Sequence, residues 1–258
     1  MTASDDPARR AILERLGRGA STEENLADVL SLGRPAVSEH LAALTEAGLV
    51  VATTIDARRI YRVTHDYDQM YADDSAPPWE IGRPQPALAA LLDRIDIESP
   101  VLDVGCGTGE LAIHVAEKGH RVVGIDFSGA GIAKARFKAA EEGLDIEFRV
   151  ADARCLGELD IRPRTVLDSG LLHSLDEKEE RLAYVTGLEA ICDPGALVCI
   201  LAVSTEAGMG WGVTRDSLAG AFSEPHWADT DVARADVLAR VGDEELQLPA
   251  LLLTSRRL

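Results

Sequence analysis

The spacing of apolar residues predicts helices in the first quarter of the chain. Three amphipathic segments come first, and their apolar residues recur at helical spacing: Ile12, Leu13 and Leu16; Leu26, Val29 and Leu30; and Val37, Leu41 and Leu44. Apolar and polar residues then alternate over residues 50–54 and 59–63, which indicates two short strands joined by a charged tip. We expect a helix, a helix-turn-helix and a β-wing over residues 1–64.

Local signals predict where these helices begin and end. Pro7, after Asp6, suits the first position of the first helix. Ser21 and Glu24 have the spacing of a capping box at the start of the second. Gly48 is expected to end the third helix in a left-handed conformation.

From Pro100 onward, short apolar runs alternate with helical segments. The runs predict strands at 101–104, 121–125, 146–150, 165–167 and 196–203, and the segments between them predict helices after the loop 105–109 and at 129–142 and 177–192. A last helix and a closing pair of strands are expected toward residue 258. Such alternation is typical of an α/β fold, a parallel sheet with helices on both faces.

Composition excludes several classes of protein. The chain of 258 residues is 46% hydrophobic and 27% charged, as soluble globular proteins are. No apolar run reaches the ~18–20 residues of a membrane helix. The start, MTASDDPARR, lacks the features of a signal peptide, so we expect a cytoplasmic protein. The four cysteines form no C-x-x-C pair, and no metal site is predicted.

Charge separates the front of the chain from the rest. The net charge of −18 divides into −1 for residues 1–64, which contain eight arginines and no lysine, and −17 for the remainder. Phosphate attraction dominates nucleic-acid affinity, so only the front could approach DNA without strong repulsion.

We predict three parts: residues 1–64, a connecting segment 65–87, and a second domain 88–258. The connecting segment is rich in proline and acidic residues and has no helical or strand period. It also holds Tyr67, Tyr71 and Trp79, and exposed aromatic surface is costly. We therefore expect it to contact the second domain, by packing alone or by facing a ligand.

The glycine-rich loop DVGCGTG, at 103–109, is the strongest sign of a binding site. It follows a strand and precedes a helix, and acids end the next strands at Asp126, Asp152 and Asp168. Ligands of such sheets bind at the carboxyl ends of the strands. The spacing G-x-G-x-G after Asp103 differs from the G-x-G-x-x-G that receives a pyrophosphate. An acid there suits a cation, such as a sulfonium with an α-amino group.

The segments VLDVGCGTG, VVGIDFS and VADA resemble, in order and spacing, the class I methyltransferases that use S-adenosylmethionine. The resemblance covers about residues 68–258 and implies a Rossmann-like, mostly parallel seven-stranded sheet. It implies that the glycines line the methionine and ribose, that Asp126 holds the ribose, and that residues 152–153 contact the adenine. The cofactor-binding residues so expected are Asp103, Gly105, Cys106, Gly107, Gly109, Asp126, Phe127, Asp152, Ala153 and Asp168.

Two further stretches, PPWEIGRPQPAL at 77–88 and VLDSGLLHSL at 166–175, are similar to the thiopurine-methyltransferase-like group. That group methylates small nucleophiles: thiols, halides and the hydroxyl groups of quinone- or quinolone-like aromatics. The resemblance implies that Trp79 and Gly82 fold over the cofactor. We expect methyl transfer to an oxygen or sulfur nucleophile of a small molecule.

His173 is the candidate general base, because it follows the predicted strand end at residues 165–167 and histidine titrates near neutral pH. The alternative is a histidine that packs behind the substrate or bonds to the backbone. A thiolate or phenolate near its own pKa needs no base. Arsenite methylation by several thiolates is a further alternative, for which only Cys155 is expected near a pocket.

The stretches SLGRPAVSEHLAALTEAGLV and RRIYRVT resemble the winged helix-turn-helix of ArsR-type repressors, without that family's metal-sensing cysteines. The resemblance implies that, if the module binds DNA, Arg34, Ser38 and His40 face the major groove and Arg58 and Arg59 the DNA backbone. Glu39 among them opposes this. The alternative function is therefore a regulator that binds DNA and responds to S-adenosylmethionine. We favour a structural role for residues 1–64, as a homodimer interface or a pocket wall.

Overall fold

The computed structural model describes residues 6–16, 21–46, 49–55, 58–63, 70–71, 77–175, 178–209, 211–241 and 244–258. The contacts between residues divide the chain into two units, residues 1–66 with 176–180 and residues 67–175 with 181–258. Each unit has its own hydrophobic core. Among the described residues, no helix combines the length and the apolar character that crossing a membrane requires.

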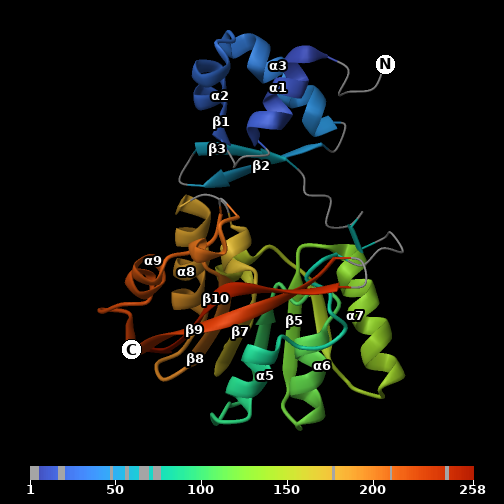
Figure 1. Cartoon of the computed structure of the whole chain (residues 1–258), viewed down its shortest axis with the longest axis vertical. Coiled ribbons are helices and arrows are strands. Elements are labelled where there is room, and N and C mark those ends of the chain that lie inside the picture. The colour runs from blue at the N-terminus through green and yellow to red at the C-terminus, as the bar shows by residue number, and fades with distance from the viewer. Residues whose placement is uncertain are drawn as a thin grey trace. The chain divides into compact units, whose positions relative to one another are not determined.

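The first unit is a three-helix module with a small antiparallel sheet (Figure 1). Its elements are α1 (Pro7–Leu16), β1 (Ser21–Thr22), α2 (Glu23–Leu30), α3 (Arg34–Glu46), β2 (Val50–Ile55) and β3 (Arg58–Val63). The sheet order is β1-β3-β2. Ile12, Leu26 and Leu41, one from each helix, are fully buried together. The predicted helix, helix-turn-helix and wing are confirmed.

The ends of these helices differ in part from the prediction. Thr22, not Ser21, caps α2, because its hydroxyl accepts from the Asn25 amide at 3.2 Å. Ser21 instead pairs with Tyr61 in the strand β1. Helix α2 ends at Ser31, in the left-handed conformation with φ 53°. Gly48 lies outside the described residues.

The second unit is built on a seven-stranded sheet of order β6-β5-β4-β7-β8-β10-β9. Its strands are β4 (Val101–Val104), β5 (Val122–Asp126), β6 (Glu147–Val150), β7 (Thr165–Ser169), β8 (Leu197–Val203), β9 (Trp227–Val241) and β10 (Glu244–Arg257). Strands β4 to β8 pair in parallel, and β10 pairs antiparallel with β8 and with β9. The predicted mostly parallel Rossmann-like sheet is confirmed.

Helices cover both faces of this sheet (Figure 1). They are α5 (Pro86–Leu92), α6 (Glu110–Glu117), α7 (Gly129–Glu141), α8 (Lys178–Ile191) and α9 (Arg215–Ala221), with short 3-10 turns η1 (Ala153–Glu158), η2 (Leu172–Ser174) and η3 (Thr205–Ala207). Leu88, Leu111 and Ile132 of α5, α6 and α7 belong to one buried cluster. Tyr184 of α8 and Leu218 of α9 belong to the other. Each helix thus buries its apolar stripe against the strands.

The segment 77–85 is attached to the outer edge of β9. The Gln85 side chain accepts from the Leu238 amide at 2.8 Å and donates to the Leu238 carbonyl at 2.9 Å. The Arg240 amide donates to the Pro78 carbonyl at 2.6 Å. One side-chain amide and one carbonyl thus take the place of a neighbouring strand, which fixes where this segment lies.

Candidate active site

The glycine-rich loop turns sharply where β4 ends. Gly105, Gly107 and Gly109 all have positive φ, at 71°, 54° and 88°. The amides of Gly105 and Cys106 donate to the Ile125 carbonyl at 2.8 and 2.9 Å. These bonds join the loop to the end of β5, and so place both strand ends at one site.

Side chains at the three glycines would collide with their surroundings. A Cβ on Gly105 would lie 2.9 Å from the Leu171 Cβ, one on Gly107 2.7 Å from the Tyr71 hydroxyl, and one on Gly109 3.0 Å from the Ala135 Cβ. Only glycine lets the backbone come this close to a neighbour. The three glycines therefore let Leu171, Tyr71 and Ala135 pack directly against the loop backbone, and the contact of the loop with a cofactor stays a prediction.

Asp126 at the end of β5 faces this loop. One carboxylate oxygen accepts from the Gly107 amide and the other from the Ser128 amide, both at 2.8 Å. Phe127 beside it is 47% exposed. The predicted ribose ligand and an exposed aromatic ring thus lie next to the glycine loop, at the carboxyl end of the sheet.

Asp152 and Ala153 follow the end of β6. The Asp152 carboxylate accepts from the backbone amide of Arg154 at 2.9 Å and forms an ion pair with its guanidinium. Ala153 is buried, with 8% of its surface exposed. The acid holds the turn η1 in place, and its contact with the adenine stays a prediction.

Asp103 lies inside the unit rather than on the surface of the loop. It is 1% exposed, and the Ala112 amide at the start of α6 donates to its carboxyl group. Its Oδ2 atom is buried and has no hydrogen-bond partner among the described residues. Burial, with nearby Asp168, raises the pKa of Asp103 to about 8.

Asp168 is fully buried at the end of β7 and supports the turn that follows. Its carboxylate accepts from the amides of Gly170 and Leu171, at 3.0 and 2.7 Å, and from the Tyr184 hydroxyl at 3.0 Å. Burial raises the pKa of Asp168 to about 7. These bonds make Asp168 a support for the loop 170–172, and its predicted contact with the cofactor is untested.

The cysteines do not assemble into a thiolate site. Cys106 is buried, and a Cβ on Gly124 would lie 3.1 Å from its sulfur. Burial raises the pKa of Cys106, Cys192 and Cys199, and Cys155 is exposed. Among the described residues, no group of three histidines, cysteines or carboxylates could hold a metal ion.

His173 lies in the turn η2 beneath the ring of Trp211. The two rings stack with centroids 5.3 Å apart and an angle of 13° between their planes. The Val203 amide donates to Nδ1 of His173 at 3.2 Å, and burial lowers its pKa to about 4. The imidazole is therefore neutral at pH 7 with its proton on Nε2, which makes it a donor. This bond argues against the general-base role and matches the alternative of a histidine bonded to the backbone.

The residues before α5 cover the glycine loop. Tyr71 is 4% exposed, and its hydroxyl accepts from the Trp79 indole at 2.9 Å. Burial raises the pKa of Tyr71 far above its usual range. Trp79 is 40% exposed, and Gly82 has φ 74°. The structure thus brings Tyr71 against Gly107, while contact of Trp79 and Gly82 with the cofactor stays a prediction.

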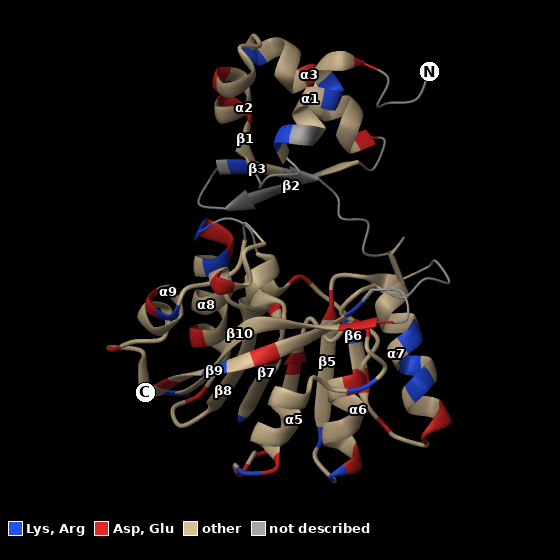
Figure 2. Cartoon of the chain, in the orientation of Figure 1, with Lys and Arg blue, Asp and Glu red and all other residues tan. Residues whose placement is uncertain are grey.

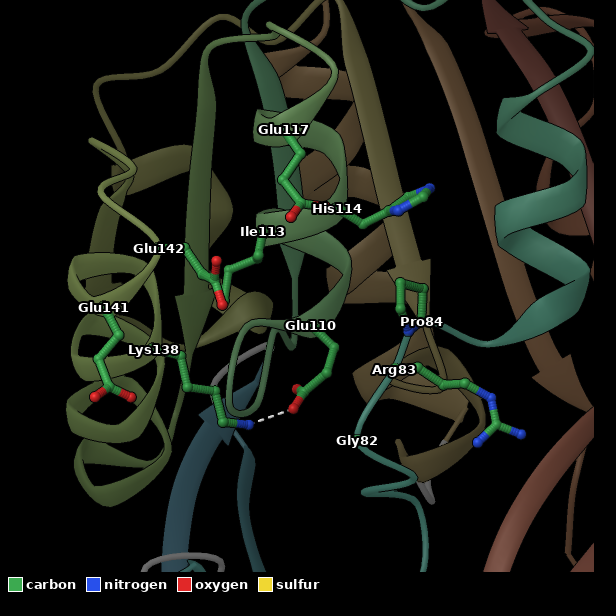
Figure 3. A pocket seen from close by; sticks show the side chains of 10 residues that line it. All are labelled: Gly82, Arg83, Pro84, Glu110, Ile113, His114, Glu117, Lys138, Glu141 and Glu142. Atoms are coloured by element: carbon green, nitrogen blue, oxygen red, sulfur yellow. Dashed lines mark hydrogen bonds and ion pairs between the residues drawn. The ribbon is translucent and has the colours of Figure 1, made fainter.

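A hollow of about 350 Å³ lies between α6, α7 and residues 82–84 (Figure 3). Figure 3 shows four glutamates along it, Glu110, Glu117, Glu141 and Glu142, with Lys138 paired to Glu110. Arg83 forms an ion pair at 2.8 Å with Glu245 of β10. The role of Arg83 is thus to attach this segment to the hairpin β9–β10.

The sequence patterns did not indicate two contacts of the site, which involve Glu80, Thr108 and Trp211. Glu80 and Thr108 lie 28 positions apart and are hydrogen-bonded, and Trp211 stacks on His173 across 38 positions. A carboxylate beside an aromatic residue in a proline-rich segment was a signal for Glu80. Trp211 had no such signal, because its place depends on how the loop after β8 folds back.

Comparison with known proteins identifies the two kinds of domain in the chain. Residues 101–195 match the methyltransferase domain family, and residues 4–52 match a helix-turn-helix domain. The 2-heptyl-1-hydroxyquinolin-4(1H)-one methyltransferase of Mycobacteroides abscessus is 39% identical over 126 residues, which are 48% of this chain and 55% of that protein. An uncharacterized methyltransferase of Schizosaccharomyces pombe is 33% identical over 44% of this chain and 78% of its own length. The chain thus spans about half the length of the first of these relatives.

A solved structure is similar over most of its length. It comes from work on the conversion of a disulfide bond into a thioacetal group during echinomycin biosynthesis. That chain is 35% identical, with a TM-score of 0.67 over 76% of this chain and 93% of its own. The similarity therefore extends beyond the glycine loop to the fold of nearly the whole solved chain.

Proposed function

Because the chain belongs to the class I methyltransferases that use S-adenosylmethionine, we propose that it transfers a methyl group to an oxygen or sulfur nucleophile of a small molecule. One observation carries the proposal: the His173–Trp211 pair stands at the ends of β7 and β8, beside the glycine loop at the end of β4. In such sheets ligands bind at these strand ends. The thiopurine-methyltransferase-like subgroup remains our expectation from residues 77–88 and 166–175.

The residues at the strand ends suit S-adenosylmethionine. The glycine loop and Asp126 lie together at the carboxyl ends of β4 and β5, and one buried oxygen of Asp103, two residues before the loop, has no hydrogen-bond partner among the described residues. We expect Gly105, Gly107 and Asp126 to hold the cofactor. When bound, the cofactor supplies an electrophilic methyl group on a sulfonium.

Trp211 supports a planar methyl acceptor. The residue is 42% exposed and its ring stacks on His173, so we propose that the ring can also receive a second flat group. The relative from Mycobacteroides abscessus acts, by its name, on a flat hydroxyquinolinone. We propose an aromatic acceptor with a hydroxyl or thiol substituent.

His173 contributes a hydrogen-bond donor rather than a base. The Nδ1 lone pair of His173 accepts from the Val203 amide, so the proton is on Nε2. The Nε2–H group can then donate to the nucleophilic oxygen of the small molecule and stabilise the anion of that molecule. The nucleophile then loses its proton to solvent before transfer. We expect kcat/KM to rise with pH through the pKa of the acceptor, since the pKa of His173 lies near 4.

The test is a panel of phenols, hydroxyquinolinones and aromatic thiols with labelled S-adenosylmethionine. Methylation of planar aromatic acceptors is the expected result, with Trp211→Ala lowering their kcat/KM by about tenfold or more and Trp211→Phe retaining most of it. Binding of S-adenosylhomocysteine is followed in parallel.

Two outcomes would contradict the proposal. If the chain binds S-adenosylhomocysteine normally but methylates no member of the panel, the proposed class of aromatic methyl acceptors is wrong. If Trp211→Ala lowers kcat/KM equally for planar and non-planar methyl acceptors, the Trp211 ring does not bind the acceptor by stacking.

A further inference from the structure

Glu80 connects the segment 77–85 to the glycine loop. Its carboxylate accepts hydrogen bonds from both the hydroxyl and the backbone amide of Thr108. Its other oxygen lies 3.0 Å from the position of a Cβ on Gly107. The carboxylate therefore rests directly on the loop at two consecutive residues.

This carboxylate is held from behind by a directed set of hydrogen bonds. The Lys138 ammonium donates to the Thr108 hydroxyl and to Glu110. The Thr108 hydroxyl lies within hydrogen-bond distance of the carboxylates of both Glu80 and Glu110, which share its single proton. The Glu80 and Glu110 side chains are only 13% and 16% exposed, and they share this one ammonium group. Figure 3 shows Lys138 of α7 reaching across to Glu110 of α6. Burying two carboxylates beside one ammonium is unfavourable unless their hydrogen bonds are made, and here they are.

The same short segment is held on its other side by the hairpin β9–β10. Gln85 bonds to Leu238 through both atoms of its side-chain amide, and Arg83 donates two hydrogen bonds to Glu245. The Arg240 guanidinium donates to the Ile81 carbonyl at 2.9 Å. With Gln85 and Arg83 attached to the sheet edge, Glu80 hydrogen-bonds the segment directly to the loop.

We propose that Glu80 is a positioning residue for S-adenosylmethionine. Its hydrogen bonds to Thr108 hold the segment 77–85, together with Trp79 and Tyr71, against the glycine loop where the methionine end of the cofactor binds. Glu80 acts through the loop and uses its hydrogen-bonding geometry, not its charge. This inference rests on the cofactor of the proposed function and needs no methyl acceptor.

The test compares Glu80→Gln with Glu80→Ala in the full-length chain, by calorimetric titration with S-adenosylhomocysteine. Glutamine at position 80 can still accept from the Thr108 amide and hydroxyl, so the affinity of Glu80→Gln for S-adenosylhomocysteine should stay within about threefold of the original. The affinity of Glu80→Ala should fall by roughly 10- to 100-fold. Glu117→Ala, an exposed glutamate on α6, is the matched control with unchanged affinity. Equal losses in Gln and Ala would show that charge recognition, not positioning, is at work, and no loss in Ala would also overturn the proposal.

Thr108 provides a second, independent variant. Thr108→Val removes the hydroxyl at nearly constant volume, and Thr108→Ser keeps it. We expect Thr108→Val, but not Thr108→Ser, to weaken the binding of S-adenosylhomocysteine. The double variant Glu80→Ala with Thr108→Val should lose less binding free energy than the sum of the losses in the two single variants. Strict additivity would show that the two residues act separately. In turnover assays the KM for S-adenosylmethionine should rise while the KM for the acceptor stays constant, and a parallel rise of both would contradict the assignment.

Discussion

Two carboxyl groups below the glycine loop are buried to the same degree but held differently. Asp168 accepts from three backbone amides and a tyrosine hydroxyl. Asp103 has one amide donor, and its other oxygen has no hydrogen-bond partner among the described residues. An unpartnered carboxylate oxygen is costly in a dry interior. Burial, with Asp168 nearby, therefore raises the pKa of Asp103 to about 8.

Asp103→Asn should stabilise the chain at high pH in the absence of cofactor. The folded carboxyl keeps its proton up to about pH 8 and the unfolded one only to about pH 4, so its contribution to stability is present below pH 4 and lost as the pH rises to 8. Asparagine does not titrate and still accepts from Ala112. We expect the melting temperature at pH 8 to rise by ~2–4 °C, equivalent to about 1 kcal/mol, with a smaller rise at pH 5.

The control for this measurement is Asp145→Asn, at an exposed aspartate. Melting curves of Asp103→Asn that run parallel to those of the original chain from pH 5 to 8 would contradict the assignment.

At this scale the sequence could predict which residues meet at the strand ends, but not which way each one points. The glycines, Asp126 and His173 lie at one end of the sheet because each follows a parallel strand. The inward turn of Asp103 and the hydrogen bond from Val203 to His173 depend on distant backbone atoms, which no local pattern encodes.

At the scale of elements, the loop after β8 determines where Trp211 stands. The amide of Val213 donates to the Val203 carbonyl at 2.9 Å, so the loop returns to the strand that it left. Gly212, with φ 122°, lies at the closest point, and a Cβ there would come within 2.9 Å of the backbone of residues 203 and 204. Because these are backbone atoms, they cannot move aside as a flexible side chain would.

Gly212→Ala should therefore displace Trp211 from His173. We expect a loss of about 1–3 kcal/mol in stability from backbone strain and a fall in kcat/KM for planar acceptors. Gly208→Asn is the matched control, because Gly208 has φ 70°, where asparagine is tolerated, and nothing within 4 Å of a Cβ. Chemical denaturation and steady-state kinetics measure the two effects, and identical behaviour of both variants would refute the explanation.

Most elements could be predicted from periodicity, but strand β1 and helix α5 were not predicted. Strands β4 to β8 begin and end within two residues of the predicted limits. The runs of β4 and β8 are buried throughout and are easily recognised, whereas β6, at the edge of the sheet, buries only Phe148. The 15- and 14-residue strands β9 and β10 were expected only as a closing pair of strands. Their length comes from pairing with each other over their full extent, including exposed residues that carry no apolar pattern.

At the scale of the molecule, the two units differ in charge and in size of core. Acidic and basic side chains are interspersed over the helices of the first unit (Figure 2). Arg34 on α3 is exposed and lies 4.0 Å from Glu24, so its charge is partly balanced. A domain of about 60 residues buries little of its own surface and is marginal alone. These features favour a structural role for residues 1–64 over DNA binding.

A chain shortened to begin at His65 should therefore bind S-adenosylhomocysteine but turn over about tenfold more slowly, a change of ~1.4 kcal/mol in the barrier. The second unit keeps both of its own buried clusters, so cofactor binding should survive. Light scattering of the full chain tests for the homodimer. Full turnover after the deletion would contradict the structural role. If the full chain also gives a specific electrophoretic mobility shift with DNA from upstream of its own gene at about 0.15 M salt, and Arg34→Ala abolishes that shift, the DNA-binding regulator is favoured instead.

The hydrogen bonds from the Gln85 side chain to Leu238 of β9 affect how this protein behaves at high concentration. The outer edge of a sheet presents unpaired backbone groups that can template the addition of a strand from another chain, the first step toward aggregation. At Leu238 and Arg240 those groups are already taken by Gln85 and Pro78. Prolines at 77, 78 and 84 have no amide proton, so the covering segment lacks donors with which a strand from another chain could pair. The attachment that places Glu80 over the glycine loop thus also protects part of the sheet edge from self-association.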